Sequence, residues 1–141
     1  MARPIVLSAR AIQNMPEESF PSTTPGGNVT WRTLLSSPST PSTALTTGLA
    51  RCAAQGGQLK CHRHSHPEIY YIVSGRGVVS IKGVERAVGK GDVVFIPGDA
   101  VHGVRNDDEG EELVWLYVFA ADGFGEVVYQ FCGEGAGKAR L

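Results

Sequence analysis

Short runs of β-branched and aromatic residues alternate with clusters of glycine, proline and aspartate along most of this chain. Runs of this kind, such as residues 68–73 and 113–120, are typical of strands, and the clusters between them are typical of turns. We expect strands at residues 4–9, 29–35, 43–54, 59–64, 68–73, 78–82, 85–88, 93–96, 102–105, 113–120 and 126–131, and no long helix. The pattern therefore predicts an all-β fold, either a barrel or a sandwich.

The alternation of side chains along a strand predicts which residues face the interior. Tyr70 lies two positions after Glu68, so both side chains should point inward, whereas Tyr71 should point outward, toward the sheet surface or a dimer contact. Residues 93–96 are apolar throughout, which predicts a strand buried on both faces, and residues 106–111 should form a solvated acidic turn. The large side chains expected in the core are Phe95, Trp115, Tyr117 and Phe119.

The length of the chain, 141 residues, suggests one domain with a substantial core. Residues 17–28 are rich in proline, serine, threonine and glycine, which predicts a loop. We expect an N-terminal strand and loop segment at residues 1–28, a β-barrel at residues 29–132 and a disordered tail at residues 133–141.

Charge and hydropathy argue against two kinds of partner. Lysine and arginine number 13, aspartate and glutamate number 14, and no basic run is present. A nucleic acid or an anionic membrane surface needs a concentrated basic face, and no apolar run approaches the length of about 18 residues that spans a bilayer. The N-terminal apolar stretch is also too short for a secretory signal. We therefore expect a small-molecule substrate as the partner, and neither nucleic acid nor membrane.

The three cysteines, Cys52, Cys61 and Cys132, are odd in number and show no repeated spacing. This argues against a disulfide framework and favours a reducing, cytoplasmic location. Cys61 adjoins His62, and neighbours on a strand point to opposite faces. We therefore interpret Cys61 as a packing residue and not as a metal ligand.

Histidine and glutamate gather between residues 62 and 68. His62 and His64 are two positions apart, so they share one face of a strand. The turn that follows brings Glu68 opposite the histidine pair, and His102 lies on a strand distant in sequence. Three imidazoles and a carboxylate suit iron, manganese, nickel, zinc or copper; the alternative is a histidine-rich surface turn. The metal prediction fails if Nε2 of His102 lies more than about 5 Å from the other two, since true bonds span about 2 Å.

The spacing around these residues resembles the first motif of the cupin family. That motif has a glycine, five residues, His-x-His, three or four residues, a glutamate, six residues and a glycine. The chain fills its fixed positions with Gly56, His62, His64, Glu68 and Gly75.

A second stretch resembles the second cupin motif, in which a glycine is followed by Pro-x-Gly, a histidine and an asparagine. The chain fills these positions with Gly91, Pro97, His102 and Asn106. Asp99 stands where the second glycine of the motif is expected, and aspartate tolerates turn conformations.

The resemblance implies a single-domain double-stranded β-helix, or jelly-roll barrel, that forms homodimers. It also implies one divalent metal ion per chain (Fe, Mn, Ni or Zn) bound by His62, His64, Glu68 and His102.

Known cupin activities include those of dioxygenases, decarboxylases, lyases and isomerases. We predict a metal-dependent enzyme acting on a small organic molecule, with a narrow preference for an Fe(II)-type dioxygenase, because residues 30–38 are similar to a segment of small diketone-cleaving cupins. The complete four-residue ligand set points instead to manganese, nickel or zinc. The second alternative is a non-redox metal-dependent lyase, decarboxylase or isomerase. A non-catalytic cupin that binds a metal or a small ligand is the third alternative.

Three residues are candidates for catalysis. Glu68 acts as a base if it leaves the metal, or remains a ligand. Tyr70 lines the pocket with a phenol, or fills the core. His66 binds substrate or carries a proton, or is an exposed turn residue or an alternative metal ligand.

Overall fold

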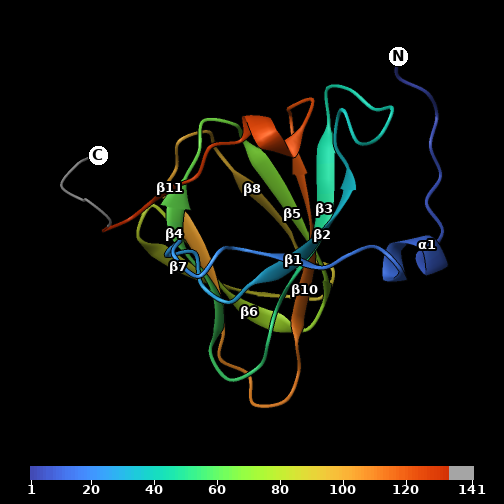
Figure 1. Ribbon diagram of the computed structural model, residues 1–141. Coiled ribbons are helices and arrows are strands. Elements are labelled where there is room, and N and C mark those ends of the chain that lie inside the picture. Colours follow the sequence, from blue (N-terminus) through green and yellow to red (C-terminus); the bar gives the residue numbers. More distant parts are fainter. Residues whose placement is uncertain (134–141) are drawn as a thin grey trace.

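The computed structural model describes residues 1–133 and arranges them as two antiparallel β-sheets that face each other (Figure 1). The first sheet contains, in spatial order, β1 (Glu18–Ser19), β2 (Thr30–Leu35), β3 (Thr46–Cys52), β10 (Leu113–Phe119), β5 (Glu68–Ser74) and β8 (Val93–Ile96). The second contains β11 (Gln130–Phe131), β4 (Gly57–Arg63), β9 (His102–Asn106), β6 (Arg76–Ile81) and β7 (Val84–Gly89). The all-β prediction is confirmed, and within residues 1–133 no helix has the length and apolar character needed to cross a bilayer.

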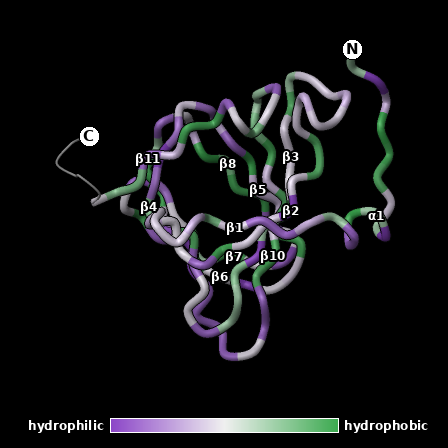
Figure 2. Tube along the Cα trace, in the orientation of Figure 1, coloured by the Kyte–Doolittle hydropathy of each residue, from purple (hydrophilic) through white to green (hydrophobic). Residues whose placement is uncertain are grey.

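The core lies between the inner faces of the two sheets. β10 is the central strand of the first sheet, and its side chains Trp115, Tyr117 and Phe119 are buried, as expected. Figure 2 shows hydrophobic residues along the strands and hydrophilic ones in the loop between β9 and β10. Gly48 in β3 is a glycine for a steric reason, because a Cβ atom there would collide with the Tyr117 hydroxyl.

The turn before β9 explains the unusual residue in the second motif. Asp99 has a φ of 64°, in the left-handed region that favours glycine. Aspartate tolerates this conformation better than most residues do. The backbone N–H of Asp99 donates to the carbonyl of His64 at 2.8 Å, so the turn is tied to the histidine strand.

Both ends of the described chain differ from the sequence prediction. Residues 4–9 form no strand; instead a short helix, α1 (Ala9–Gln13), begins after Ser8, whose hydroxyl accepts from the Ala11 N–H. The last strand is β11 alone, preceded by a 3-10 helix, η1 (Phe124–Glu126). The tail predicted at residues 133–141 lies outside the described residues except for Gly133.

The expectation that residues 93–96 are buried on both faces is wrong, and so is the core position of Phe95. Val93 and Phe95 are 66% and 62% exposed, because nothing within residues 1–133 covers the outer face of β8, which ends the first sheet. An apolar run identifies a strand without telling whether its second face is covered.

The expectation of a solvated turn is wrong for Asn106, which is fully buried. Its side-chain N–H groups donate to the carbonyls of Cys52 and Glu111 at 3.2 and 2.9 Å, and its side-chain oxygen accepts from the Asp108 N–H at 3.0 Å. The motif asparagine therefore shapes the loop that follows β9.

Candidate metal centre

Three strands bring the candidate ligands together. His62 lies in β4 and faces His102, its register partner in β9. His64 follows the end of β4, and Glu68 is the first residue of β5. Because neighbouring strands of a sheet lie about 4.8 Å apart, side chains on one face of paired strands come within reach of a common point.

The predicted ligand atoms converge. The ring nitrogens that His62, His64 and His102 offer lie within 4.8 Å of one another. Oε1 of Glu68 lies 3.2 Å from Nε2 of His64 and 3.3 Å from Nε2 of His102. All four side chains are buried, so the alternative of a histidine-rich surface turn is excluded.

The hydrogen bonds of the outer ring nitrogens orient the three imidazoles. Nδ1 of His62, His64 and His102 lies 2.7, 2.9 and 2.8 Å from the carbonyl oxygens of Lys60, His66 and Ala100. A carbonyl only accepts, so each Nδ1 carries the proton, and each neutral ring keeps its lone pair on Nε2. These carbonyls are the kind of outer partner that fixes metal-binding histidines.

The inner atoms of the cluster have no partner of their own. Nε2 of the three histidines and Oε1 of Glu68 are buried without a hydrogen bond. Burying several lone pairs around one point is costly unless a cation satisfies them. The residues present therefore fit a divalent metal ion, and the imidazole and carboxylate donors do not select among iron, manganese, nickel and zinc.

Burial keeps one ligand neutral. The pKa of His62 is well below its usual value, chiefly because burial disfavours the charged ring and secondarily because His102 lies nearby. A neutral imidazole is the form that binds a metal.

A small cavity adjoins the cluster. Glu68 and Tyr70 line it together with aromatic residues of the first sheet and of the N-terminal and C-terminal segments. Its free space is about 20 Å³, room for about one water molecule. Tyr70 points inward, as expected, and its hydroxyl is buried without a partner. Burial and then the nearby Glu68 carboxylate raise the pKa of Tyr70 well above its usual value. Tyr71 points outward, also as expected.

His66 has a different place from the one expected for a substrate-binding group. Its backbone carbonyl accepts from Nδ1 of His64, the residue is half-buried, and Nδ1 of its own ring is buried without a hydrogen bond. His66 does not line the cavity, and its ring nitrogens are not among those that converge in the cluster.

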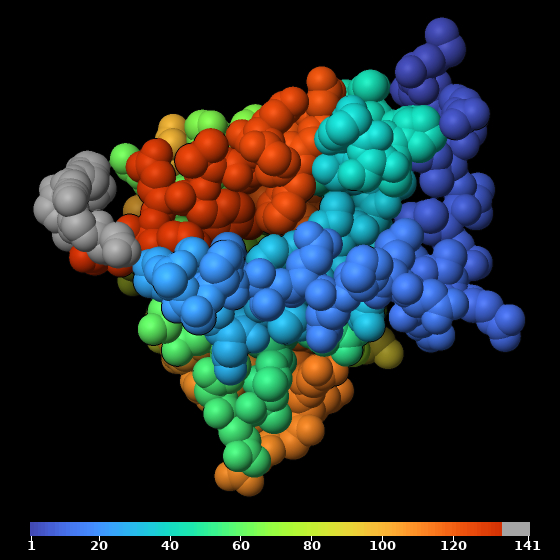
Figure 3. Space-filling view, viewed as in Figure 1, coloured from blue at the N-terminus to red at the C-terminus, as the bar shows by residue number. Residues whose placement is uncertain are grey.

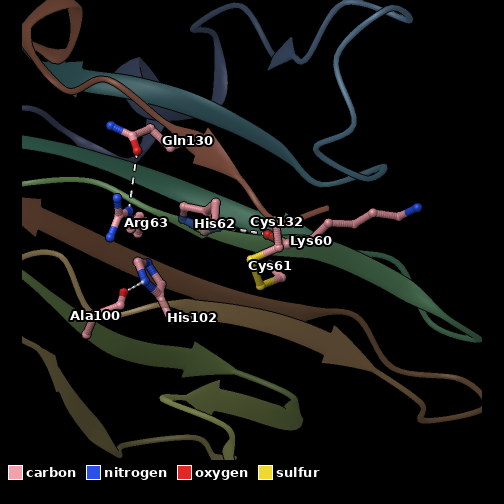
Figure 4. The surroundings of a disulfide bond; sticks show 8 residues. All are labelled: Lys60, Cys61, His62, Arg63, Ala100, His102, Gln130 and Cys132. Atoms are coloured by element: carbon pink, nitrogen blue, oxygen red, sulfur yellow. Dashed lines mark hydrogen bonds between the residues drawn. A yellow bond between two sulfur atoms is a disulfide. The ribbon is translucent and has the colours of Figure 1, made fainter. Parts of the chain in front are cut away.

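Sequence reasoning missed the covalent link beside the site. Cys61 and Cys132 form a disulfide across 71 positions, so interpreting Cys61 as a packing residue was wrong (Figure 4). The remaining thiol, Cys52, is buried, and burial raises its pKa to about 12. No local spacing signals a pair so distant in sequence, because only the pairing of β11 with β4 brings the two cysteines together.

Tyr129 was missed as well. Its ring stacks on His62 with the ring centroids 4.6 Å apart and the planes 12° apart. Tyr129 lies in residues 126–131, where the sequence predicts a strand. No sequence pattern indicated its contact with the histidines.

Known proteins match this chain in sequence and in fold. The family model for the cupin domain matches residues 50–119. Dimethylsulfoniopropionate lyase DddW from Ruegeria pomeroyi is 38% identical over 105 residues, which cover 74% of this chain and 67% of that enzyme. The chain belongs to the cupin family.

Solved structures share the fold of this cupin. The polyketide cyclase RemF from Streptomyces resistomycificus has a TM-score of 0.72 at 18% identity, covering 96% of this cupin and 89% of that chain. A predicted oxalate decarboxylase from Thermotoga maritima has a TM-score of 0.66 at 23% identity, covering 83% and 99%. At such identities the likeness concerns the fold, which supports several reactions.

Proposed function

We propose that this cupin is a metal-dependent lyase that acts on dimethylsulfoniopropionate or a closely similar small carboxylate. The observation that carries the proposal is the convergence of three unpartnered histidine nitrogens and the Glu68 carboxylate in a chain 38% identical to a dimethylsulfoniopropionate lyase.

The chemistry of that substrate suits the cavity. Dimethylsulfoniopropionate has a carboxylate at one end and a sulfonium cation at the other. The carboxylate can approach the metal-binding cluster, and the sulfonium can lie among the aromatic rings, which attract cations. The aromatic lining residues are Phe20, Trp31, Trp115, Tyr117, Phe124 and Tyr129, with Tyr70 beside Glu68.

The elimination balances without an oxidant. A base removes a proton from the carbon next to the carboxylate, the C–H electron pair forms a carbon–carbon double bond, and the C–S bond breaks with its electrons on sulfur. The products are acrylate, dimethyl sulfide and a proton. A bound divalent cation would supply positive charge that stabilises the negative charge developing at the carboxylate.

Tyr70 is the residue we propose as the base. Its hydroxyl lies at the cavity beside Glu68 and has no other partner. Burial and the Glu68 carboxylate raise its pKa, so the free hydroxyl stays protonated near neutral pH. The positive charge of a divalent cation bound at the cluster would favour its ionisation. Glu68 then acts as the fourth ligand. A catalytic role for His66 remains a prediction, and His66 does not line the cavity.

The dioxygenase preference also remains a prediction. The lyase alternative is favoured by the identity to DddW. Non-catalytic binding of a metal or a small ligand is the outcome that the experiment must separate from both.

The test uses the purified untagged protein loaded separately with Fe(II), Mn(II), Ni(II) and Zn(II). We expect dimethyl sulfide, measured by gas chromatography, and an equal amount of acrylate from dimethylsulfoniopropionate under argon. Metal-loaded protein that releases neither product would overturn the lyase proposal. Consumption of oxygen with a β-diketone, a catechol or a 2-oxo acid would favour the dioxygenase instead.

We further propose that the protein is a homodimer formed through the outer face of β5 and β8. The exposed apolar side chains on this face are Ile69, Tyr71, Val73, Val93 and Phe95. β8 ends its sheet, and a free strand edge can pair with the same edge of a second copy around a two-fold axis. Phe95→Glu should give a monomer by light scattering. A monomeric wild-type protein at 100 μM would contradict the proposal.

The cytoplasmic location remains a proposal. Disulfides in reducing compartments are usually transient or regulatory, so a cytoplasmic location would give the Cys61–Cys132 bond that character.

A further inference from the structure

The segment that ends at Cys132 forms one wall of the cavity that adjoins the histidine cluster. Tyr129 and Phe124 line this cavity, and the Tyr129 ring lies on His62. The Phe131 ring contacts Phe20 from the N-terminal segment, with centroids 5.4 Å apart. Figure 3 shows these two segments, red and blue, side by side on one face of the molecule.

Little secondary structure holds this wall in place. β11 contains two residues, which pair with Arg63 and His62 of β4. The Arg63 side chain donates to that of Gln130 at 3.3 Å, and the Cys132 N–H donates to the Cys61 carbonyl at 3.0 Å. The remaining strand residues around the cavity belong to strands of six or seven residues.

The disulfide holds the same wall covalently. Cys132 follows β11 directly, and Cys61 precedes His62 in β4 (Figure 4). Since adjacent residues point to opposite faces, His62 is buried inside while Cys61 is exposed outside, as is Cys132. A reductant can therefore reach the bond without entering the cavity.

The cavity is too small for a substrate while the wall is in place. Its free space of about 20 Å³ compares with about 300–1,000 Å³ for ordinary ligand pockets. Something must move to admit a molecule larger than water. The C-terminal wall is joined to β4 by a strand of only two residues.

We propose that the Cys61–Cys132 disulfide is a clamp that holds Tyr129 against His62 and restricts entry to the metal site, and that a dithiol opens it. In the opening step the dithiol reduces the S–S bond to two thiols and is itself oxidised to a disulfide. Two electrons and two protons pass to the cysteines. This proposal rests on the proposed function in one respect, namely that a substrate must reach the metal site. It does not depend on which reaction the substrate then undergoes.

The test measures entry to the site without metal or substrate. Diethyl pyrocarbonate modifies unprotonated histidine, and trypsin releases residues 91–105, which contain His102 and no other histidine. We expect His102 to be modified at least tenfold faster in Cys132→Ser than in the oxidised wild type. Wild type reduced with dithiothreitol and desalted under argon should match the variant. Hydrogen exchange of residues 127–132 should accelerate in both.

Val128→Ser is the matched control, because Val128 is exposed in the same segment and takes no part in the disulfide. In Val128→Ser, diethyl pyrocarbonate should modify His102 at the wild-type rate. Adding reductant to Cys132→Ser should not change the rate at which His102 is modified. Cys52 does not interfere, because it is buried and un-ionised near neutral pH.

Three results would overturn the proposal. The first is a modification rate of His102 within twofold of wild type in both disulfide-free forms. The second is unfolding of both forms, seen by circular dichroism, which would mean that the disulfide stabilises the whole fold and not only the position of the C-terminal segment. The third is the absence of the Cys61–Cys132 peptide from a non-reducing digest of air-oxidised protein. None of these results depends on lyase activity, so the two proposals fail separately.

Discussion

Two walls of the same cavity are built in different ways. The inner wall presents the candidate ligands from β4, the residue that follows its end, β5 and β9, and β5 and β9 are each paired with a strand of at least four residues on both sides. The C-terminal wall presents Tyr129 from a segment with a two-residue strand and one disulfide. The inner wall can hold atoms at fixed distances, as metal binding requires. The C-terminal wall is joined to it at two register pairs, with His62 and Arg63 of β4.

The largest effect should come from removing a ligand of the inner wall. His102→Ala should weaken metal binding by more than about 100-fold, the upper end of the loss seen for mutated outer partners of ligands. Metal content after dialysis, measured by elemental analysis, checks this. His66→Ala is the control and should retain its metal, because the ring nitrogens of His66 are not among those that converge in the cluster. Equal loss in the two variants would contradict the proposed ligand set.

A smaller effect is expected when the inner wall keeps its metal but loses the proposed base. Tyr70→Phe should lower kcat by about 10²- to 10⁴-fold, the usual contribution of a positioned acid–base group, while metal content stays unchanged. Tyr71→Phe, on the outer face, should have little effect. If Tyr70→Phe keeps wild-type kcat for dimethyl sulfide release, the residue is core filler.

The pH dependence of stability tests the buried state of the inner wall. The folded-state pKa of His62 is depressed, so below pH 6.5 the unfolded chain binds a proton that the folded chain does not. The free energy of unfolding of the metal-free protein should therefore fall as pH drops, with a slope of at most about 1.4 kcal/mol per pH unit from this group. Urea titrations at pH 7.5, 6.5 and 5.5 measure the slope. His62→Gln should flatten it, and an unchanged slope would mean that His62 is solvated.

The smallest effect should come from a conservative change in the C-terminal wall. Tyr129→Leu keeps an apolar side chain but loses the stacking on His62, so we expect a loss of about 0.5–1.5 kcal/mol in the free energy of unfolding. The metal content should not change. A loss of metal comparable to that of His102→Ala would show that the two walls are not independent.

The sequence predicted the inner wall well because its signals are local. His62 and His64 share a face by strand alternation, and the facing of Tyr70 and Tyr71 follows from the same rule. The spacing of the two motifs joined these residues to His102. The ligand geometry then required that β4 and β9 pair and that the first sheet bring Glu68 of β5 to them.

The outer face of β8 shows where local signals end. Phe95 is an aromatic residue in an apolar strand, as Trp115 is, yet Phe95 is exposed and Trp115 is buried. The difference depends on whether a sheet or a second copy covers that face, and alternation within one strand carries no information about it.

The sequence by itself determined the all-β class, most of the strands and the identity of the candidate ligands, because strand periodicity and turn residues act over a few positions. Only the tertiary structure decided that Cys61 meets Cys132, that Tyr129 stacks on His62 and that the free space beside the cluster is small. These contacts join positions about half the chain apart, and their formation depends on how the two sheets pack.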